Sequence, residues 1–270
     1  MSLDFTLHTT PSVPLEAEAL SAAGLAGLSA AEAARLTVVH GNRAAEVGEF
    51  FRVGGTPDGE VHVSGDLTRI KRLGAGMTGG RMVVHGPVGM HVGTGMTGGE
   101  IVVEGDAGDW VGSAMSGGRI IVRGNAGHLA GSASRGDAVG MRGGEVVVFG
   151  NAGNEVGSGM RRGLVAIGGD TGDFTGVNML AGTIVVLGRL GQRTGAGMKR
   201  GTIVSMHPAD LLPTFGYACS YRPVFLRLYL VHLRSLGLPV SDAQLAGRYR
   251  RWSGDAMELN RGEVLLLDHP

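Results

Sequence analysis

Five basic residues fall near one phase of a repeating sequence, and they are the clearest candidates for a site. They are Arg142, Arg161, Arg162, Lys199 and Arg200. If the repeats stack, these side chains lie near one corner of the later units, where their positive charges add together. Such a corner would suit an anionic ligand or an acidic partner protein. The alternative interpretation is a solvated basic edge.

Motifs that would indicate catalysis are weak. The segments GAGMTG (74–79) and GTGMTG (93–98) match the dinucleotide fingerprint, but each precedes an expected strand instead of opening a helix. The single cysteine, Cys219, is expected to be buried rather than nucleophilic. One set of polar residues shares a phase of the repeat: Asp109, His128, Asn154 and Asp173. We interpret this set as a ladder that satisfies turns, in preference to a metal site. The sequence therefore predicts neither a catalytic nor a metal-binding residue in this chain.

A fixed period organises the chain between Gly59 and Val204. A marker glycine precedes each expected strand, at Gly80, Gly99, Gly118, Gly144, Gly163, Gly182 and Gly201. The successive differences are 19, 19, 26, 19, 19 and 19, so one unit carries an insertion of seven residues (26 minus 19). A methionine lies three residues before each marker, at Met77, Met96, Met115, Met141, Met160, Met179 and Met198. Units of this length cannot bury a face alone and must stack into a solenoid.

The pattern inside each unit predicts an all-β fold, a parallel β-helix of about eight coils with a 19-residue repeat. The second and fourth residues after the marker are apolar, as Ile101 and Val103 are, so one strand face turns inward. The methionines are expected to form an internal stack. The residue directly after the marker alternates in charge: Glu60, Arg81, Glu100, Arg119 and Glu145. In a stack with all coils in register, these side chains form an outer ladder of opposite charges.

The chain divides into three expected parts. Residues 1–35 form a strand and an alanine-rich helix, N-capped at Ser29, that close one end of the stack. Residues 36–206 form the β-helix solenoid, with residues 36–51 as an imperfect first coil. Residues 207–270 form a helical extension that ends in a strand.

The C-terminal extension is predicted in more detail. A helix runs from Pro223 to Leu236, and a second helix covers residues 242–252. A final strand over residues 262–268 echoes the repeat and should pair with the stack or its flank. Both sides of the first helix are apolar, so we expect protein to cover it.

The outward strand positions are apolar where a solvated face would be polar. The third residue after the marker reads Val83, Val102, Ile121, Val147, Ala166 and Val185. Such a face must be covered by the C-terminal helices, by another subunit, or by both. The insertion near residues 132–138 adds a corner loop, which could contact a partner or be idle. The candidate partner contacts are Ser132, Arg135, Asp137, Phe149, Leu187 and Met206.

Composition narrows the class of protein. The formal net charge is zero, which argues against nucleic acid or an anionic membrane as the main partner. One cysteine cannot form an intrachain disulfide. No signal peptide and no long apolar run is visible, so a cytoplasmic location is expected.

Five runs carry a resemblance to a known family: VVHGNRAAEVGEFF, GDLTRIKRLGAGMTGGRMVVHG, GDAGDWVGSAMSGGRIIVRGNAGHLAG, GNAGNEVGSGMRRG and GRLGQRTGAGMKRGTIV. They resemble the C subunit of formylmethanofuran dehydrogenase and, at least as well, the C subunit of the bacterial formyltransferase/hydrolase complex. The likeness covers nearly the whole chain, including the tail RYRRWSGDAMELNRGE. The C-terminal β-helical domain of glutamate synthase is a more distant relation, which shares the glycine pattern but not the tails.

The resemblance implies a right-handed β-helix that serves as a non-catalytic subunit and binds no cofactor itself. In the bacterial complex, formyltransferase and amidohydrolase-like subunits move a formyl group from tetrahydromethanopterin to a methanofuran-type cofactor with an acidic glutamyl tail. They then hydrolyse it to formate. The archaeal enzyme instead couples formyl chemistry to molybdenum or tungsten redox. We favour the bacterial version. A glutamate-synthase-like structural β-helix and a stand-alone ligand-binding solenoid remain as alternatives.

Overall fold

The computed structural model describes residues 2–56 and 59–268, and these are mostly β-structure. The strands of the N-terminal part are β1 (Leu3–Leu7), β2 (Leu15–Glu16), β3 (Thr37–His40), β4 (Arg43–Glu46), β5 (Phe51–Gly55) and β7 (Ile70–Lys71). The stacked strands are β6 (Glu60–Ser64), β8 (Arg81–His85), β9 (Glu100–Val103), β10 (Arg119–Val122), β11 (Arg142–Val148), β12 (Arg162–Ile167), β13 (Thr183–Val186) and β14 (Thr202–Ser205). The last strands are β15 (Tyr217–Tyr221), β16 (Tyr249–Ser253) and β17 (Glu263–Leu267). The helices are α1 (Ala22–Leu25), α2 (Ala30–Ala34), α3 (Val224–Ser235) and α4 (Asp242–Ala246), with short 3₁₀ turns η1 (Val47–Glu49) and η2 (Ala256–Glu258).

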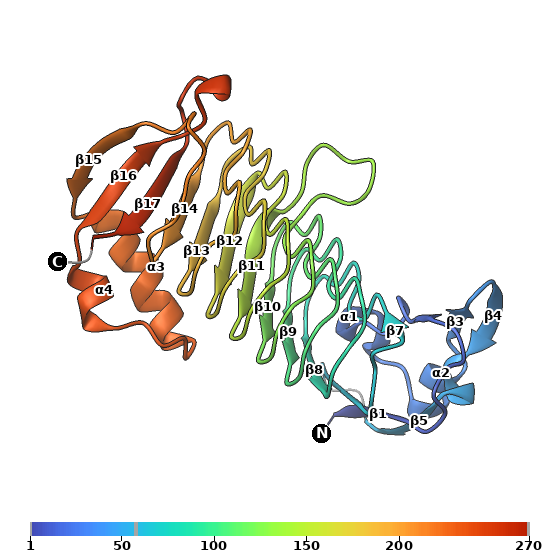
Figure 1. The fold of residues 1–270 in the computed structure, drawn as a ribbon. Helices are drawn as coiled ribbons and strands as arrows, with labels where there is room; N and C mark the ends of the chain where they lie inside the picture. Colours follow the sequence, from blue (N-terminus) through green and yellow to red (C-terminus); the bar gives the residue numbers. More distant parts are fainter. Residues whose placement is uncertain (1, 57–58, 269–270) are drawn as a thin grey trace.

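One large sheet runs the length of the molecule (Figure 1). It has thirteen strands in the order β15-β16-β17-β14-β13-β12-β11-β10-β9-β8-β6-β1-β5. From β1 to β17 through β14, neighbouring strands are parallel. A second sheet of four short strands, in the order β4-β3-β2-β7, lies at the N-terminal end.

The strand register carries the sequence repeat into space. Arg81 pairs with Glu100 and Glu100 with Arg119, each 19 positions on, whereas Arg119 pairs with Glu145 across the insertion. A second column of single parallel bridges joins Leu67, Val88, Ala107, Ala126, Ala152 and Thr171 on successive turns of the chain. The chain therefore winds as a β-helix-like stack with a long strand on one side of each turn and a single bridge on another.

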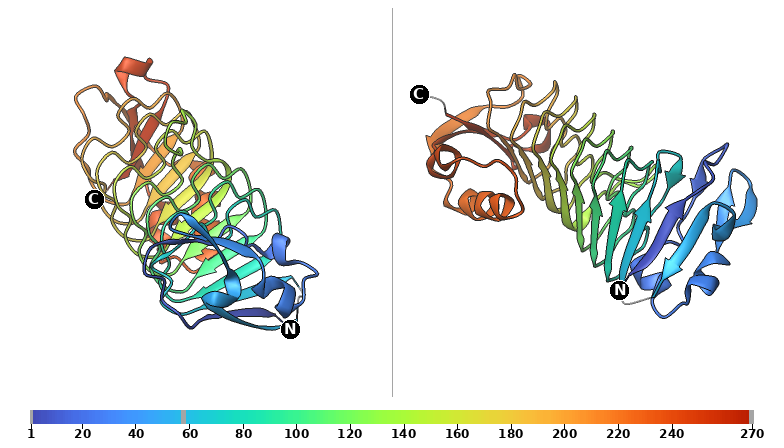
Figure 2. Two further views of the ribbon diagram at one scale, coloured as in Figure 1. Left: turned by 90° about the vertical axis from the view of Figure 1, so that its right-hand side faces the viewer. Right: turned by 90° about the horizontal axis from the view of Figure 1, so that it is seen from below.

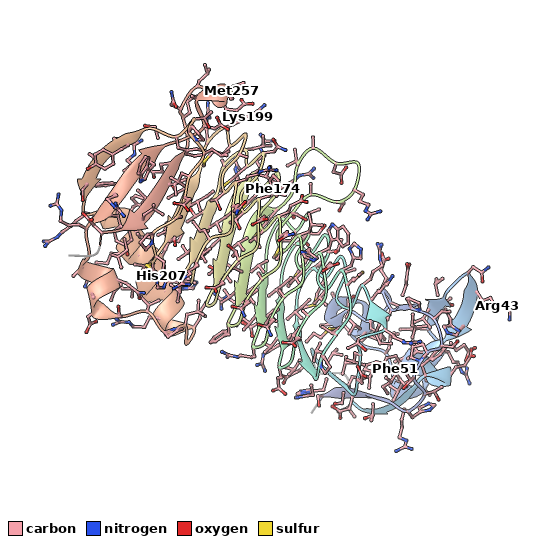
Figure 3. The ribbon with its side chains drawn as sticks, in the orientation of Figure 1. Arg43, Phe51, Phe174, Lys199, His207 and Met257 are labelled. Atoms are coloured by element: carbon pink, nitrogen blue, oxygen red, sulfur yellow. The ribbon has the colours of Figure 1, made fainter. Side chains whose placement is uncertain are left out.

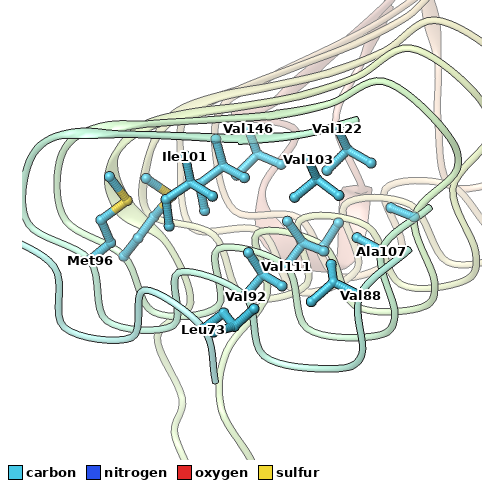
Figure 4. Packing of buried hydrophobic residues seen from close by; sticks show 14 of the residues in the cluster. Leu73, Val88, Val92, Met96, Ile101, Val103, Ala107, Val111, Val122 and Val146 are labelled. Carbon is cyan, nitrogen blue, oxygen red and sulfur yellow. The ribbon is translucent and has the colours of Figure 1, made fainter. Parts of the chain in front are cut away.

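The interior of the stack is filled by the apolar columns that the repeat predicts. All seven repeat methionines are fully buried, at 0% exposure. Figure 4 shows Met96 at one corner of the interior, with Ile101, Val103, Val92 and Val111 lining the rest. The prediction of an internal methionine stack is confirmed. Its unbranched side chains fill a corner whose shape repeats from turn to turn.

The N-terminal part departs from the expected solenoid. Residues 36–51 do not form a first coil, because β3 and β4 pair as an antiparallel hairpin. The two residues between these strands are Gly41 and Asn42, and Gly41 has φ +66°, which favours a tight hairpin turn. Instead, β1 pairs parallel with β6 and so extends the stack, while β5 pairs antiparallel with β1 at the sheet edge. The expected alanine-rich helix is reduced to α1 and α2, and α2 has the predicted capping box between Ser29 and Glu32.

The C-terminal extension confirms two predictions and corrects two others. Helix α3 forms as expected, and β17 pairs parallel with β14 as a further strand of the stack. The second helix ends at Ala246, where Gly247 adopts an extended conformation with φ −65° and ψ 159°. The following residues form β16, which pairs antiparallel with both β15 and β17. Cys219 lies on β15 and is exposed, so its expected burial is wrong. No helix in the described part of the chain is long and apolar enough to cross a bilayer.

The marker glycines yield a test of the stacking. Gly118 has φ +82°, and an added Cβ would lie 2.6 Å from Cε of Met96 and 2.8 Å from the carbonyl oxygen of Gly99. Gly95 has φ +68°, but an added Cβ would meet nothing within 4 Å. We expect Gly95→Ala to cost about 1 kcal/mol from the left-handed backbone alone. Gly118→Ala should cost roughly twice that or more in the free energy of unfolding measured in urea. Equal losses would contradict the close approach of neighbouring coils.

Candidate interface on the C-terminal half of the stack

The outer surface of the early coils carries the predicted ladder of charges. Arg81 bridges Glu60 and Glu100, and its Nε lies 3.1 Å from Glu100 Oε1. Arg119 continues the ladder, with its Nε 2.8 Å from Glu145 Oε2. After Glu145 the same column reads Leu164, Thr183 and Thr202, so the ladder stops at β11. This end of the ladder marks the point where another element covers the sheet.

Helix α3 contacts this last carboxylate through His232 in its last turn. Nε2 of His232 lies 2.9 Å from Oε1 of Glu145, although the ring nitrogen does not meet the geometry of a hydrogen bond. Burial alone would raise the pKa of the Glu145 carboxyl, but the contacts with Arg119 and His232 outweigh it and hold that pKa below its ordinary value of 4.5. The charge ladder therefore fastens α3 to the stack.

The inner side of α3 covers the apolar outer face of the later strands. Leu226, Leu230 and Leu233 are buried and belong to a second core together with residues of the outer strand face. The strand residues of this core include Val147, Ala166, Val185, Leu187, Val204 and Met206. The expectation that the C-terminal helices cover this face is therefore confirmed.

The same packing corrects part of the proposed partner interface. Leu187 and Met206 are 7% and 1% exposed, because α3 and its neighbours in the second core cover them. Phe149 is half-buried at the edge of this core, and the guanidinium of Arg123 lies 4.3 Å from its ring centroid. These side chains are contacts within the chain, so the covered face leaves Leu187 and Met206 no surface for a partner.

The structure brings three of the five predicted basic residues into one open hollow. Arg161, Arg162 and Arg200 line it together with Tyr229 of α3, and its volume is about 420 Å³. Arg142 lies one strand away, paired in register with Arg162. All of these arginines are exposed, and none forms an ion pair with a described residue. We call Arg161, Arg162 and Arg200 the arginine groove.

Lys199, the fifth basic residue, lines a different hollow of about 370 Å³. Asp137 of the insertion and Glu258 of η2 line the same hollow. Figure 3 shows Lys199 and Met257 close together at the edge where η2 projects. The basic corner is therefore split into a groove beside α3 and a lysine that faces acidic side chains.

The insertion projects as a loop between β10 and β11 (Figure 1). Ser132 is fully buried at its base, whereas Arg135 and Asp137 are exposed. The guanidinium of Arg135 lies 5.4 Å from the ring centroid of Trp110, and the hydroxyls of Ser134 and Ser113 are 3.1 Å apart. The loop is thus held against the preceding coil and presents Arg135 and Asp137 outward.

One column of outward residues escaped sequence analysis. On each coil a non-glycine residue adopts a left-handed backbone, and these are Arg72, His91, Trp110, Leu129, Glu155, Phe174 and Arg193. His91 and Trp110 stack with their ring centroids 5.0 Å apart, and Arg193 lies 5.3 Å from the ring of Phe174. Each of these residues lies two positions before a glycine of the repeat, such as Gly112 after Trp110, so the repeat itself held the signal.

The polar column that was weighed against a metal site serves the turns. Oδ1 of Asp109 accepts a hydrogen bond from the backbone N–H of His128, and Nδ1 of His128 accepts one from that of Asn154. Asn154 continues the same pattern to Asp173. Residues 2–56 and 59–268 contain no group of three histidine, cysteine or acidic side chains placed to hold a metal ion. The interpretation as a turn-satisfying ladder is confirmed.

Comparisons with known proteins assign the chain to a family. A model of the GXGXG motif matches residues 100–213. The C subunit of the tungsten-containing formylmethanofuran dehydrogenase 2 of Methanothermobacter wolfeii is 43% identical over 87 residues, which cover 30% of this chain and 32% of that protein. The C subunit of the molybdenum-containing formylmethanofuran dehydrogenase 1 of Methanosarcina barkeri is 42% identical over 85 residues, with 30% and 28% covered. The match thus spans about a third of the length of these curated relatives.

A solved structure matches the chain nearly from end to end. It is the X-ray crystal structure of the formyltransferase/hydrolase complex FhcABCD from Methylorubrum extorquens in complex with methylofuran. The matching chain in it aligns with a TM-score of 0.92 and 34% sequence identity, covering 98% of this chain and 100% of that one. The chain belongs to the family of the C subunit of the bacterial formyltransferase/hydrolase complex. It is homologous to the C subunit of formylmethanofuran dehydrogenase.

For this C-subunit homologue, the Glu145 contact predicts how stability depends on pH. The folded pKa of Glu145 is lowered, so its stabilising effect is complete above its ordinary value of 4.5 and is lost as the pH falls through the folded pKa. We expect Glu145→Gln to lower the melting temperature at pH 7, at a cost of about 1–2 kcal/mol. The variant and the parent should converge as the pH falls below the folded pKa of Glu145.

Glu104→Gln is the matched control, because Glu104 also pairs with a histidine, His85, but its side chain is 53% exposed. Its melting temperature should stay close to that of the parent between pH 5 and pH 7. A constant difference between Glu145→Gln and the parent over the whole pH range would contradict the role assigned to the Glu145 carboxylate.

Proposed function

We propose that this protein is the non-catalytic scaffold subunit of a complex that transfers a formyl group and hydrolyses it. In this complex the formyl group passes from tetrahydromethanopterin to a methanofuran-type cofactor, and hydrolysis releases formate. The observation that carries the proposal is the end-to-end match to a chain of a formyltransferase/hydrolase complex, which includes the cap and the C-terminal extension. The partners would be the formyltransferase and amidohydrolase-like subunits.

The chemistry of the described side chains supports a structural role. The pKa of Asp255 is lowered, because hydrogen bonds from the backbone N–H groups of Gly197 and Met257 outweigh its burial. The pKa of Tyr249 is raised by burial; its hydroxyl donates to the carbonyl oxygen of Gln244 and lies 3.5 Å from Sδ of Met206 in the stack. These shifts, like that of Glu145, belong to contacts that fasten the C-terminal extension to the stack. Such contacts hold the extension in a fixed position on the stack, as a structural role requires.

The proposal includes the finer architecture. The stack winds in a right-handed sense through about eight coils, between a cap in residues 1–35 and an extension in residues 207–270. The complex acts in the cytoplasm. This chain holds the other subunits, which bind the reacting part of the cofactor, so this chain would contact only the cofactor's tail. A rigid stack supports this role, because each coil is fixed by backbone hydrogen bonds to both neighbours.

The arginine groove is proposed as the contact for a carboxylate-rich group. Its three guanidinium groups are exposed and have no ion-pair partner among the described residues, so their charges are available to a ligand. Two carboxylate sources are consistent with this chemistry: the glutamyl tail of the methanofuran-type cofactor and an acidic segment of a partner subunit. The solved relative was crystallised with methylofuran, which supports the first source.

A second candidate is the C subunit of an archaeal-type formylmethanofuran dehydrogenase. Its support is the 43% identity to the corresponding subunit of the tungsten-containing enzyme, but that match covers only 30% of this chain. Purification of the tagged protein from its host distinguishes the two. Formyltransferase and amidohydrolase-like partners support the first proposal, whereas redox subunits support the second. A chain that purifies alone contradicts both.

The double variant Arg161→Glu/Arg162→Glu tests the arginine groove. Reversing two exposed charges should weaken the binding of a carboxylate-rich ligand at least tenfold. Folding should stay intact, because both side chains lie outside the core. The readouts are the formyl-hydrolysing rate of the purified complex and retention of its subunits on a tagged column.

Arg43→Glu/Arg52→Glu is the control, since both arginines are exposed near the N-terminal hairpin. It should behave like the parent. If the groove variant assembled and turned over like the parent, the groove would have no part in the complex. Loss of hydrolysis with full assembly would point to the cofactor tail, and loss of a subunit would point to an acidic partner.

A further inference from the structure

The outer side of α3 is apolar and exposed. Val224, Leu228 and Val231 are spaced by four and three residues, so they lie on one face, opposite the buried Leu226 and Leu230. Val224 is 82% exposed, Leu228 75% and Val231 47%. Figure 2 (right) shows α3 outside the row of strands, with its far side turned away from the sheet. We call Val224, Leu228 and Val231 the α3 strip.

The α3 strip continues sideways into a shallow apolar hollow. Its lining includes Phe225, Leu228, Tyr229 and His232 of α3, Leu164 of β12 and Glu145 of β11, and its volume is about 450 Å³. Phe225 is itself 38% exposed. The sequence of α3 predicted that protein covers this helix, and the described residues of this chain cover only its inner side. An exposed surface of contiguous large apolar side chains marks a contact site.

Positive charge borders the α3 strip on both sides. On one side are Arg222 and Arg227, which are exposed and form no ion pair with a described residue. On the other side, beyond Tyr229, lies the arginine groove. The carboxylate that lines the hollow on that side, Glu145, is already engaged by Arg119 and His232. The surface is therefore an apolar centre between two cationic borders.

We infer that the α3 strip is the docking surface for another subunit of the complex, one that presents an apolar patch bordered by carboxylates. Protein interfaces have this arrangement, with an apolar centre, a polar rim and arginine enriched. A second copy of this chain fits poorly, because a two-fold contact through the strip would place arginine borders against arginine borders. The inference rests on the proposed scaffold function and names the surface through which the scaffold acts.

A single-cysteine design measures whether the strip is covered in the complex. The parent is Cys219→Ser, since Cys219 is the only cysteine and is exposed. Leu228→Cys in this background reports on the strip. Val39→Cys reports on an exposed valine of the N-terminal hairpin, which is 40% exposed in the native chain. Maleimide labelling at residue 228 should slow at least tenfold between the free chain and the purified complex, and labelling at residue 39 should not change.

Charge and apolar variants give a second, independent measurement. Leu228→Glu and Arg227→Glu should each reduce retention of the docking subunit at least tenfold, whereas Arg227→Lys should retain it. Both positions are exposed, so circular dichroism and melting temperature of the free chain should be unchanged. A Leu228→Glu complex that assembles like the parent overturns the inference.

The remaining outcomes separate failure of the docking inference from failure of the scaffold function. Rapid labelling at residue 228 in an assembled complex overturns the inference while the scaffold function stands. Failure of the parent chain to assemble with any formyltransferase or amidohydrolase-like subunit removes the scaffold function, and the inference with it. Protection of residue 228 in the free chain at high concentration, with a dimer in sedimentation velocity, assigns the strip to a second copy. Protection by anionic phospholipid vesicles assigns it to a membrane surface instead.

Discussion

The structure depends on one constraint, which is that successive coils lie in register, with paired residues 19 positions apart in most of the stack. Register turns each position of the repeat into a column, so one choice of residue is repeated along the whole stack. The interior columns are valine, isoleucine and methionine because those side chains fill a narrow core. The marker positions are glycine because a Cβ at Gly118 would collide with the coil below. A coil of different length disturbs every column at once, so the insertion is confined to a corner loop between β10 and β11.

The outer surface divides at β11. Up to that strand, alternating glutamate and arginine side chains form the first outer column and pair with one another as ions. Beyond it, the first outer column continues without charge as Leu164, Thr183 and Thr202, and α3 packs on this part of the outer face through Leu226, Leu230 and Leu233. His232 joins the two regions by resting on the last carboxylate of the ladder. The half without the charge ladder is covered by a helix whose own outer side is apolar in turn. The positions of the arginine groove and of the α3 strip follow from this division.

The two ends of the stack are closed in different ways. At the N-terminal end, β1 pairs parallel with β6, and β5 then pairs antiparallel with β1, which breaks the parallel pattern. At the other end, β17 extends the parallel series, and β16 and β15 follow it as antiparallel strands. The parallel series therefore ends at β1 and β17, and the two edge strands of the sheet, β5 and β15, belong to antiparallel pairs.

The sequence by itself determined the repeated part of the protein. The spacing of glycines and methionines predicted the buried methionine column, and the alternation from Glu60 to Glu145 predicted the charge ladder, because a periodic pattern has only one way to stack. Two local signals, the N-cap Ser29 and the helix-starting Pro223, placed the beginnings of α2 and α3. Tertiary structure alone decided the segments that occur once. Residues 36–51 imitate a coil in sequence but pair with each other as a hairpin, and residues 249–253 continue a helical pattern but pair with β15 and β17. It also decided which faces are covered. Leu187 and Met206 were predicted as partner contacts, but the packing of α3 buries them. The outer side of α3 was predicted to be covered, but the fold leaves it exposed. Burial depends on where distant segments meet, and a single stretch of sequence does not encode that meeting point.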